Sequence, residues 1–292
     1  MEGAGSLAIG IDIGGTKTAV GLVDGPTGVV LERREIETEA SRGADSLHNR
    51  LGPVVAEISG EHGTLDVGIA VPELVSPTQE IVTDVVIPGL AGDLAMRWRD
   101  LHVTAVESDV RAAAVAEARF GHGDAFDPFA FVSVGTGVSC CFVMGGRPWS
   151  GVHGAAILLG SGVVVERGIE PSPSPLESVA GGPGLLARFR SLGGRAATAQ
   201  EVVAMSSDDA SAREAVAAAG AALGAGIAEM VNLLDPAAVV VGGGLGAAGG
   251  SYWESAVAEA RERIWADVAR DVPLLRSRIG PDAGLIGAAL VA

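Results

Sequence analysis

The amino-acid sequence predicts an α/β protein whose sheets are covered by helices on both faces. Segments predicted as strands alternate along the chain with segments predicted as helices. Several strand segments are apolar along their whole length, which is typical of strands buried on both faces. There are two such blocks, and each opens with a strand pair around a glycine-rich turn, so the sequence resembles an internal duplication. The length of 292 residues also favours about two domains.

The first block is predicted to begin with an antiparallel meander of three strands. Its first strand is apolar except for Asp12, and Gly14 and Gly15 form the turn that follows. A helix and two short buried strands come next. The predicted ranges are 7–13, 18–24 and 29–38 for the meander, 44–61 for the helix, and 65–71 and 103–106 for the later strands.

The second block follows an alanine-rich helix predicted over residues 109–120. Two of its strands are separated by Gly135, Thr136 and Gly137, and a later buried strand ends at a run of three glycines. The predicted ranges are 130–134, 138–144 and 237–241 for strands, 201–233, 252–269 and 283 onward for helices, and 168–175 for a proline-rich loop.

The composition excludes several classes of partner. A hydrophobic fraction of 48% and a charged fraction of 19% are ordinary for a globular protein, and the formal net charge of −16 supplies no basic face for nucleic acid. The sequence has no leader pattern and no window of 18 uninterrupted apolar residues. With only two cysteines, Cys140 and Cys141, it has no disulfide framework. We expect a cytoplasmic protein without a nucleic-acid or membrane partner.

Three glycine-rich turns are candidates for phosphate binding, because glycine lets the backbone approach a ligand and consecutive amides form a concave anion site. They are Asp12 to Lys17, Gly135 to Gly137 and Gly242 to Gly244. One such turn alone is more often an ordinary turn. None matches the phosphate-loop or dinucleotide-binding glycine pattern, so those two classes are excluded.

Asp12 lies inside an otherwise apolar strand, directly before the first of these turns. A buried carboxylate is costly unless it is paired or lies near a metal. A position near Mg²⁺ and phosphate, through a bridging water, explains this placement. The alternative is that Asp12 only caps the turn.

Asp109 stands where a short strand meets the alanine-rich helix. Ligands collect at the carboxyl ends of strands in open α/β sheets, and a carboxylate there can accept a proton from an attacking hydroxyl. The alternative is a helix N-cap, which the local sequence alone favours.

In their order along the chain, these segments resemble the ROK family of bacterial sugar kinases. The resemblance covers nearly the whole chain, and the ordered set is more specific than any one member. The segments are Asp12-Ile-Gly-Gly-Thr-Lys17, Glu107-Ser-Asp109, Gly135-Thr-Gly137, Asn232-Leu-Leu-Asp-Pro236 followed by Gly242-Gly-Gly244, and Asp282-Ala-Gly-Leu-Ile-Gly-Ala-Ala289.

The resemblance implies an actin-like, ribonuclease-H-like duplicated fold with two domains around a central cleft. A small domain would comprise residues 1–112 with a returning C-terminal helix over 282–292, and a large domain residues 113–281. The family also implies a homodimer that uses ATP and Mg²⁺ to phosphorylate a sugar hydroxyl, by expectation the 6-hydroxyl.

The resemblance further implies a role for each matching residue. Asp109 would be the catalytic base, and Asp12 would lie near Mg²⁺ through water. The phosphates would be held by Gly14, Gly15, Thr16, Lys17, Gly135, Thr136 and Gly137, and Gly242, Gly243 and Gly244 would lie near the adenosine. The sugar contacts would come from Glu73, Glu107, Ser108, Asp109, His153 and Glu177.

The sequence departs from the family pattern around the sugar. Ser108 replaces a usual asparagine, and Leu158 and Ser161 stand where a sugar-binding glutamate and a zinc- and sugar-associated histidine are expected. Residues 167–175 replace a cysteine-rich zinc loop. No zinc site is expected, because a closed zinc site needs about four nitrogen or sulfur ligands.

Glu73 follows Pro72 where the family commonly has glycine. Together with Glu107, Asp109 and Glu177, a carboxylate there would make the sugar site strongly acidic and favour a cationic substrate. We therefore expect an unacetylated amino sugar, such as kanosamine or glucosamine. The alternative is that Glu73 points to solvent.

Three other functions remain open. The first is a glucokinase or another neutral-hexose kinase. The second is a sugar-sensing regulator, which would need an N-terminal helix-turn-helix that the position of Asp12 leaves no room for. The third is a catalytically silent sugar-binding protein, against which the retention of Asp12, Asp109 and the glycine turns argues.

Overall fold

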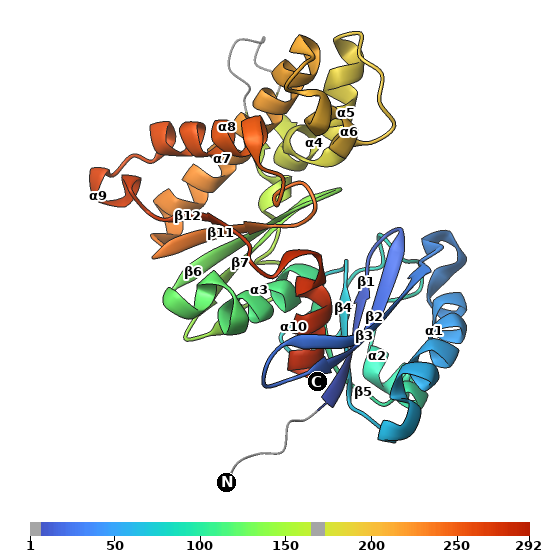
Figure 1. Ribbon diagram of the computed structural model, residues 1–292. Coiled ribbons are helices and arrows are strands. Elements are labelled where there is room, and N and C mark those ends of the chain that lie inside the picture. Colours follow the sequence, from blue (N-terminus) through green and yellow to red (C-terminus); the bar gives the residue numbers. More distant parts are fainter. Residues whose placement is uncertain (1–6, 165–172) are drawn as a thin grey trace. The chain divides into compact units, whose positions relative to one another are not determined.

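The computed structural model describes residues 7–164 and 173–292, which pack as two compact units (Figure 1). The first unit comprises Met1–Asp124, Gly146–Ala156 and Pro281–Ala292, and the second comprises Ala125–Gly145 and Ile157–Gly280. The boundary expected after residue 112 falls inside helix α3 (Asp109–Phe120), because the whole of this helix belongs to the first unit, where it packs against α10 (Ala283–Val291).

The first unit is built on a five-stranded sheet with the order β3-β2-β1-β4-β5. Strand β1 pairs antiparallel with β2 and parallel with β4, which in turn pairs parallel with β5. The carboxyl ends of these three parallel strands therefore lie at one edge of the sheet. The strands are β1 (Leu7–Ile13), β2 (Lys17–Asp24), β3 (Val29–Glu37), β4 (Val67–Val71) and β5 (Val103–Ser108).

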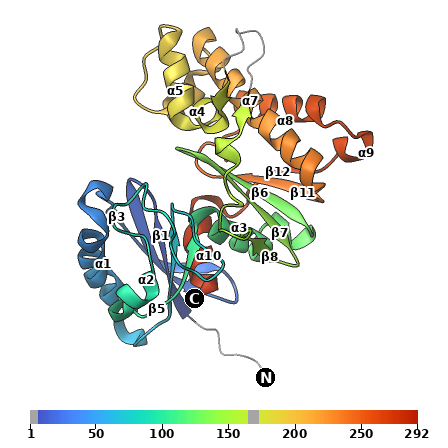
Figure 2. The same cartoon turned by 180° about the vertical axis from the view of Figure 1, so that it is seen from behind.

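Helices cover both faces of this sheet. Helix α1 (Gly43–Ser59) lies on one face, and α3 and α10 lie on the other, as Figure 1 and the view from behind in Figure 2 both show. The short α2 (Leu94–Arg97) packs near β5. The buried positions of α1 recur every three or four residues, as an amphipathic helix requires. They are Ala44, Leu47, Leu51, Val55 and Ile58.

Glycines let α10 approach its neighbours at backbone distance. A Cβ atom at Gly68 in β4 would overlap the carbonyl oxygen of Ala288, and one at Gly287 would overlap the carbonyl oxygen of Ala112. Both positions thus exclude larger residues. This close packing fixes α10 on the sheet and on α3, so the N-terminal turn of α10 is held near the carboxyl end of β1.

The second sheet has the order β12-β11-β6-β7-β8. The two sheets have the same arrangement. In each, the first strand along the chain is central, the next two strands lie on one side of it, and two later strands lie on the other side. This repeated arrangement is the internal duplication that the sequence predicts. The strands are β6 (Phe129–Val134), β7 (Val138–Met144), β8 (Arg147–Trp149), β11 (Ala238–Gly242) and β12 (Leu274–Arg276), with two-residue strands β9 (Val163–Val164) and β10 (Ser174–Pro175) forming a separate pair.

Two helices expected in the second block are each divided in two. Helix α7 has its own N-cap, because Asp209 Oδ1 accepts a hydrogen bond from the amide of Ala212. Helix α8 ends before Ile264, whose backbone is extended, and Asn232 Oδ1 then accepts the amide of Trp265. The helices are α4 (Leu176–Ala180), α5 (Gly182–Ser191), α6 (Ala199–Met205), α7 (Ala210–Leu234), α8 (Gly250–Arg263) and α9 (Asp267–Arg270).

Helix α7 is the one helix in the described ranges whose length and mean hydropathy would allow a membrane span. Of the apolar 18-residue stretch of α7 that meets this criterion, 67% is buried inside the protein, as in the core helix of a globular unit. Of the loop expected over 168–175, positions up to 172 lie outside the described residues.

Candidate active site

Parallel pairing in the first unit brings three acidic side chains to the same sheet edge. Asp12 in β1 lies in register with Ala70 in β4, and Ala70 lies in register with Glu107 in β5. Asp109 follows β5 as the first residue of α3. The structure thus gathers Asp12, Glu107 and Asp109 at the carboxyl ends of the strands, the edge at which open α/β sheets bind ligands.

Asp12 and Asp109 both have raised pKa values. Burial raises the pKa of Asp12 to about 7, and the negative charges of Asp109 and Asp282 add to this effect. Burial also raises the pKa of Asp109 to about 6, although the amide of Val110 donates to its Oδ1 over 2.6 Å. A cation placed here would be stabilised, and Asp109 is poised to gain and lose a proton near neutral pH.

The first turn of α10 closes on the Asp12 carboxylate. A Cβ atom at Gly284 would overlap Oδ2 of Asp12, so a larger residue at this position would displace the Asp12 carboxyl group. Asp282, directly before the helix, accepts a hydrogen bond from Arg33 Nε at 3.1 Å. Sequence reasoning quoted these C-terminal residues as part of a motif but assigned them no role.

The turn after β1 is held by two buried threonines. The amide of Gly14 donates to the carbonyl of Lys17 over 2.9 Å, and the hydroxyl of Thr38 donates to the carbonyl of Gly14 over 2.7 Å. Thr18 and Thr38 share a further hydrogen bond of 2.8 Å. Gly15, like its two successors in the turn, is exposed. The expected phosphate turn is therefore ordered and open to a ligand.

Lys17 does not have a free ammonium group. Its Nζ lies 2.6 Å from Glu35 Oε1 in an exposed ion pair, and this hydrogen bond raises the pKa of Lys17. A phosphate contact by the side chain would have to share the ammonium group with Glu35. The backbone amides of the turn thus remain the main phosphate candidates.

In the second unit, the other two glycine turns adjoin each other. Strands β6 and β11 run parallel with Ser133 opposite Gly242, so Gly135–Gly137 and Gly242–Gly244 follow the same sheet edge. Gly243 has a φ of 81°, and a Cβ atom there would overlap the carbonyl of Val134. Glu177 lies beside the first of these turns, since a Cβ atom at Gly137 would be 3.0 Å from its Oε2.

Glu73 is placed differently from both sequence expectations. It is only 4% exposed, so it does not point to solvent, and both of its carboxylate oxygens are already occupied. Oε2 accepts bonds from the Thr83 hydroxyl (2.6 Å) and the Val85 amide (3.1 Å), and Oε1 accepts the amides of Val86 (2.6 Å) and Ile87 (3.1 Å). Glu73 thus folds the loop over 83–87 and offers no free oxygen to an ammonium group.

Ser108 also differs from the prediction of a sugar contact. Its side chain is fully buried, and its Oγ has no hydrogen-bond partner among the described residues. His153, by contrast, is exposed. Glu107 keeps a 23% exposed side chain, and its contacts all use Oε1, which leaves Oε2 available to a ligand.

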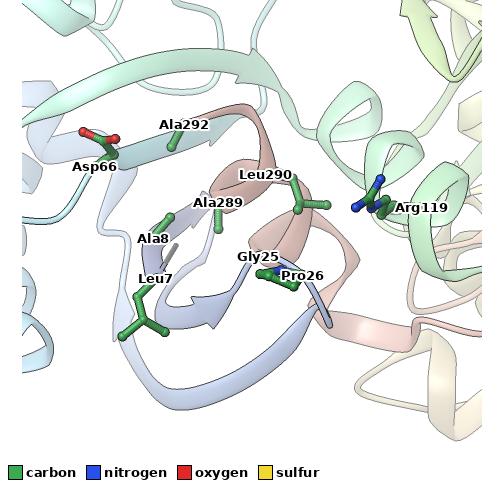
Figure 3. Close-up of a pocket in the computed structure, with 9 residues that line it drawn as sticks. All are labelled: Leu7, Ala8, Gly25, Pro26, Asp66, Arg119, Ala289, Leu290 and Ala292. Atoms are coloured by element: carbon green, nitrogen blue, oxygen red, sulfur yellow. The ribbon is translucent and has the colours of Figure 1, made fainter. Parts of the chain in front are cut away.

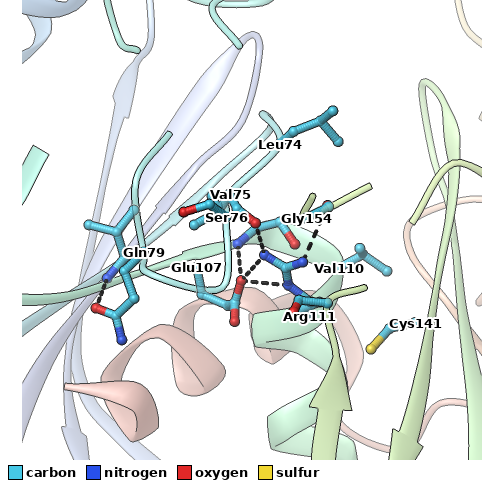
Figure 4. A network of polar contacts seen from close by, with 12 residues as sticks. Leu74, Val75, Ser76, Gln79, Glu107, Val110, Arg111, Cys141 and Gly154 are labelled. Carbon is cyan, nitrogen blue, oxygen red and sulfur yellow. Dashed lines mark hydrogen bonds and ion pairs between the residues drawn. The ribbon is translucent and has the colours of Figure 1, made fainter. Parts of the chain in front are cut away.

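Arg111 is a residue that sequence reasoning missed. It is 1% exposed and reaches Glu107, Val75 and Gly154 (Figure 4). The spacing of Glu107 and Arg111 gave no helical signal, because Glu107 lies in β5 and Arg111 in the first turn of α3. The two backbone carbonyls that complete its contacts lie far away in the sequence.

The acidic edge fits a magnesium ion held mainly by phosphates and water. Among residues 7–164 and 173–292, no group of three or more His, Cys, Asp or Glu side chains is placed to hold a metal. Mg²⁺ typically uses one or two carboxylates together with water and substrate phosphates, and Asp12 supplies such a carboxylate.

A cavity of ≈ 430 Å³ in the first unit lies away from these residues (Figure 3). Leu7 and Ala8 at the start of β1 and Asp66 directly before β4 line it, together with Arg119 and the end of α10. It is therefore at the amino edge of the parallel strands, and none of the expected site residues borders it.

Comparison with known proteins identifies similar chains. The model of the ROK family matches residues 8–292. The N-acetylmannosamine kinase of Escherichia fergusonii is 29% identical over 295 residues, which cover 97% of both chains. The bifunctional enzyme NanE/NanK of Brucella melitensis is 30% identical over 291 residues, or 97% of this chain and 53% of that protein. The chain thus spans about half the length of the bifunctional relative.

Solved structures of ROK family proteins are also similar to this chain. A ROK family glucokinase from Streptomyces griseus, in complex with glucose and AMPPNP, superposes with a TM-score of 0.83 at 27% identity and covers 98% of this chain and 99% of its own. The ROK hexokinase from Thermus thermophilus gives a TM-score of 0.79 at 28% identity, covering 98% and 97%. The actin-like duplicated fold expected from the sequence is confirmed.

Proposed function

Because the chain belongs to the ROK family, we propose that it is an ATP-dependent carbohydrate kinase with Asp109 as its general base. Relatives of matching length are named as N-acetylmannosamine kinase and glucokinase. The observation that carries the proposal is the pair of carboxylates, Asp12 and Asp109, at the sheet edge beside the exposed turn over Gly14–Lys17.

Asp109 has one oxygen in a suitable state for proton transfer. The Val110 amide engages Oδ1, so Oδ2 is the oxygen that would receive the sugar hydroxyl proton. With a pKa of about 6, the carboxyl is mostly ionised at pH 7 to 8 and still basic enough to accept a proton. The sugar oxygen forms a bond to the γ-phosphorus, the bond from γ-phosphorus to the bridging oxygen breaks, and ADP leaves with that electron pair.

Asp12 is proposed to hold Mg²⁺ through water. Bound Mg²⁺ would neutralise negative charge on the ATP phosphates during transfer. Amides of the turn over Gly14–Lys17 and of Gly135–Gly137 would bind phosphate oxygens, and Gly242–Gly244 would lie near the adenosine. A cation beside Asp12 would stabilise its ionised form, and so offset the burial and the neighbouring negative charges that raise the pKa of this residue.

For the substrate we propose an amino sugar, phosphorylated at its 6-hydroxyl. The proposal is supported by the relatives named N-acetylmannosamine kinase and by two carboxylates outside the interior, Glu107 and Glu177. Glu73 no longer supports a free amine over an acetylated one, because its oxygens are occupied. Phosphorylation of glucose is the second candidate, favoured by the likeness to the Streptomyces griseus glucokinase.

A sugar panel with Mg·ATP and an assay of ADP release tests this proposal. The panel contains glucose, mannose, glucosamine, kanosamine, N-acetylglucosamine and N-acetylmannosamine. We expect kcat/KM for at least one amino sugar to exceed that for glucose tenfold or more. If glucose is preferred over every amino sugar, the substrate proposal fails and the glucokinase function stands.

We also propose that the enzyme works in the cytoplasm as a homodimer. The cytoplasm supplies its ATP, and the acidic surface implied by the net charge favours solubility. Sedimentation at micromolar concentration separates a dimer from a monomer.

A further inference from the structure

We propose that Arg111 is a positioning residue that sets the sugar side of the site relative to Asp109. From its position on helix α3, Arg111 holds two loop segments in place. One covers residues 150–156 and includes His153, and the other covers residues 72–76. This inference depends on the proposed function and on the expectation from the sequence that His153 and Asp109 contact the same sugar. All the residues involved belong to the first unit.

The Arg111 guanidinium joins three separate segments of the chain (Figure 4). Its Nη2 donates to the carbonyl of Val75 over 2.6 Å, and its Nη1 donates to the carbonyl of Gly154 over 3.3 Å. Its Nε and Nη2 both lie 2.6 Å from Glu107 Oε1. One planar group thus fixes two loops and the end of β5.

The burial of Arg111 makes this arrangement sensitive to the loss of any partner. The side chain is 1% exposed, so its charge depends on the Glu107 carboxylate for compensation. Lysine carries the same charge, but all its donors are on one nitrogen atom. It therefore cannot reproduce the planar guanidinium geometry that reaches two carbonyls and a carboxylate at once.

Gly154 shows how closely the segments approach. It is buried with a φ of 73°, and a Cβ atom there would overlap the carbonyl oxygen of Val75. The two carbonyls that Arg111 binds therefore come from backbones in direct contact. Because Arg111 is two residues after Asp109 on one helix, a shift of this junction displaces His153 relative to Asp109.

The test compares the wild type with Arg111→Met and Arg111→Lys, using Arg119→Met as the matched control. Arg119 is an exposed arginine near the end of the same helix, and it borders the cavity at the opposite edge of the sheet. Steady-state kinetics give KM for the best sugar and for ATP separately, and amide hydrogen exchange reports on each segment of the unliganded protein.

For Arg111→Met we expect the sugar KM to rise at least tenfold and the ATP KM to stay within twofold. Amides over 72–76 and 150–156 should exchange at least tenfold faster, while those of β1 keep wild-type rates. Arg111→Lys should show an intermediate loss. Arg119→Met should match the wild type in every measurement.

Three results would overturn the proposal. They are an unchanged sugar KM in Arg111→Met, unchanged exchange over 150–156, or faster exchange throughout the first unit with equal losses in both KM values. The last result, or failure of both variants to fold, would make Arg111 a residue of general stability. If the wild type phosphorylates no sugar, the proposed function fails, and the exchange measurement still decides whether Arg111 holds the two segments.

Discussion

Asp109 lies close enough to Asp12 for its negative charge to raise the pKa of Asp12, an effect second only to burial. The two residues are 97 positions apart in the sequence, and parallel pairing of β1, β4 and β5 brings them to one sheet edge. The raised pKa values of these two buried carboxyl groups have consequences for stability, for pH dependence and for catalysis.

Replacing Asp12 by asparagine should change how stability depends on pH. The folded-state pKa of Asp12, about 7, lies above its usual value of 3.8, so the folded protein keeps a proton that the unfolded chain releases between these values. The Asp12 contribution therefore favours folding at low pH and is lost as pH rises to about 7. The free energy of unfolding is measured by chemical denaturation in EDTA for the wild type and for Asp12→Asn. Between pH 4.5 and pH 8, the stability of Asp12→Asn relative to the wild type should increase by about 2 kcal/mol. A difference that does not vary with pH would contradict the raised pKa.

The turnover rate should show an acid limb that belongs to Asp109. A base with a pKa of about 6 becomes protonated below that pH, so kcat should fall tenfold per pH unit on the acid side. The measurement is kcat at saturating Mg·ATP and sugar from pH 5 to pH 9. A rate that stays constant down to pH 5 would show that no group with this pKa acts as the base.

Glu73→Gln should reduce stability without changing substrate charge preference. The four donors from Thr83, Val85, Val86 and Ile87 face an anionic acceptor, and an amide NH₂ group would repel some of them. We expect a loss of about 2 kcal/mol in the free energy of unfolding. Charged and neutral sugars should be affected by the same factor.

The control for this variant is Glu80→Gln, an exposed glutamate in the same loop, which should leave both quantities unchanged. A selective loss of activity toward free amino sugars in Glu73→Gln would instead restore the original prediction for Glu73.

The packing of α10 gives a paired glycine test. Gly287→Ala puts a Cβ atom onto the carbonyl of Ala112 and should destabilise the protein by about 3 kcal/mol. Gly52→Ala in α1 meets only Leu101 Cδ2 at 3.9 Å, so it should stabilise the helix by about 0.5–1 kcal/mol. Thermal unfolding of both variants measures the contrast. Equal effects of the two changes would mean that α10 does not pack closely on α3.

Local sequence patterns predicted the elements that depend on local physics. The buried strand over 7–13 and the alanine-rich helix over 109–120 match the structure at both ends. The division of the helix expected over 201–233 was missed because alanine-rich segments flank the break on both sides and were read as one helix. The polar break over 206–209 and its Asp209 cap were read as ordinary helical positions.

Side-chain environment was predictable where topology fixes it and not where a loop does. Asp12 and Asp109 follow from the strand ends that carry them. Glu73 and Ser108 do not, because the donors to Glu73 come from the irregular segment over 83–87 and the full burial of Ser108 is a matter of tertiary packing that its local sequence does not reveal. Arg111 likewise needs two carbonyls that no sequence spacing reveals.

The transfer of phosphate from ATP to the best sugar by Asp109→Asn tests the central proposal most directly. Asparagine keeps the size of the side chain and the hydrogen bond to Val110 but cannot accept the hydroxyl proton. We predict a fall in kcat of at least about 100-fold, with the sugar KM within threefold and the protein folded. A variant that retains more than a tenth of the wild-type kcat would contradict the assignment of Asp109 as the base.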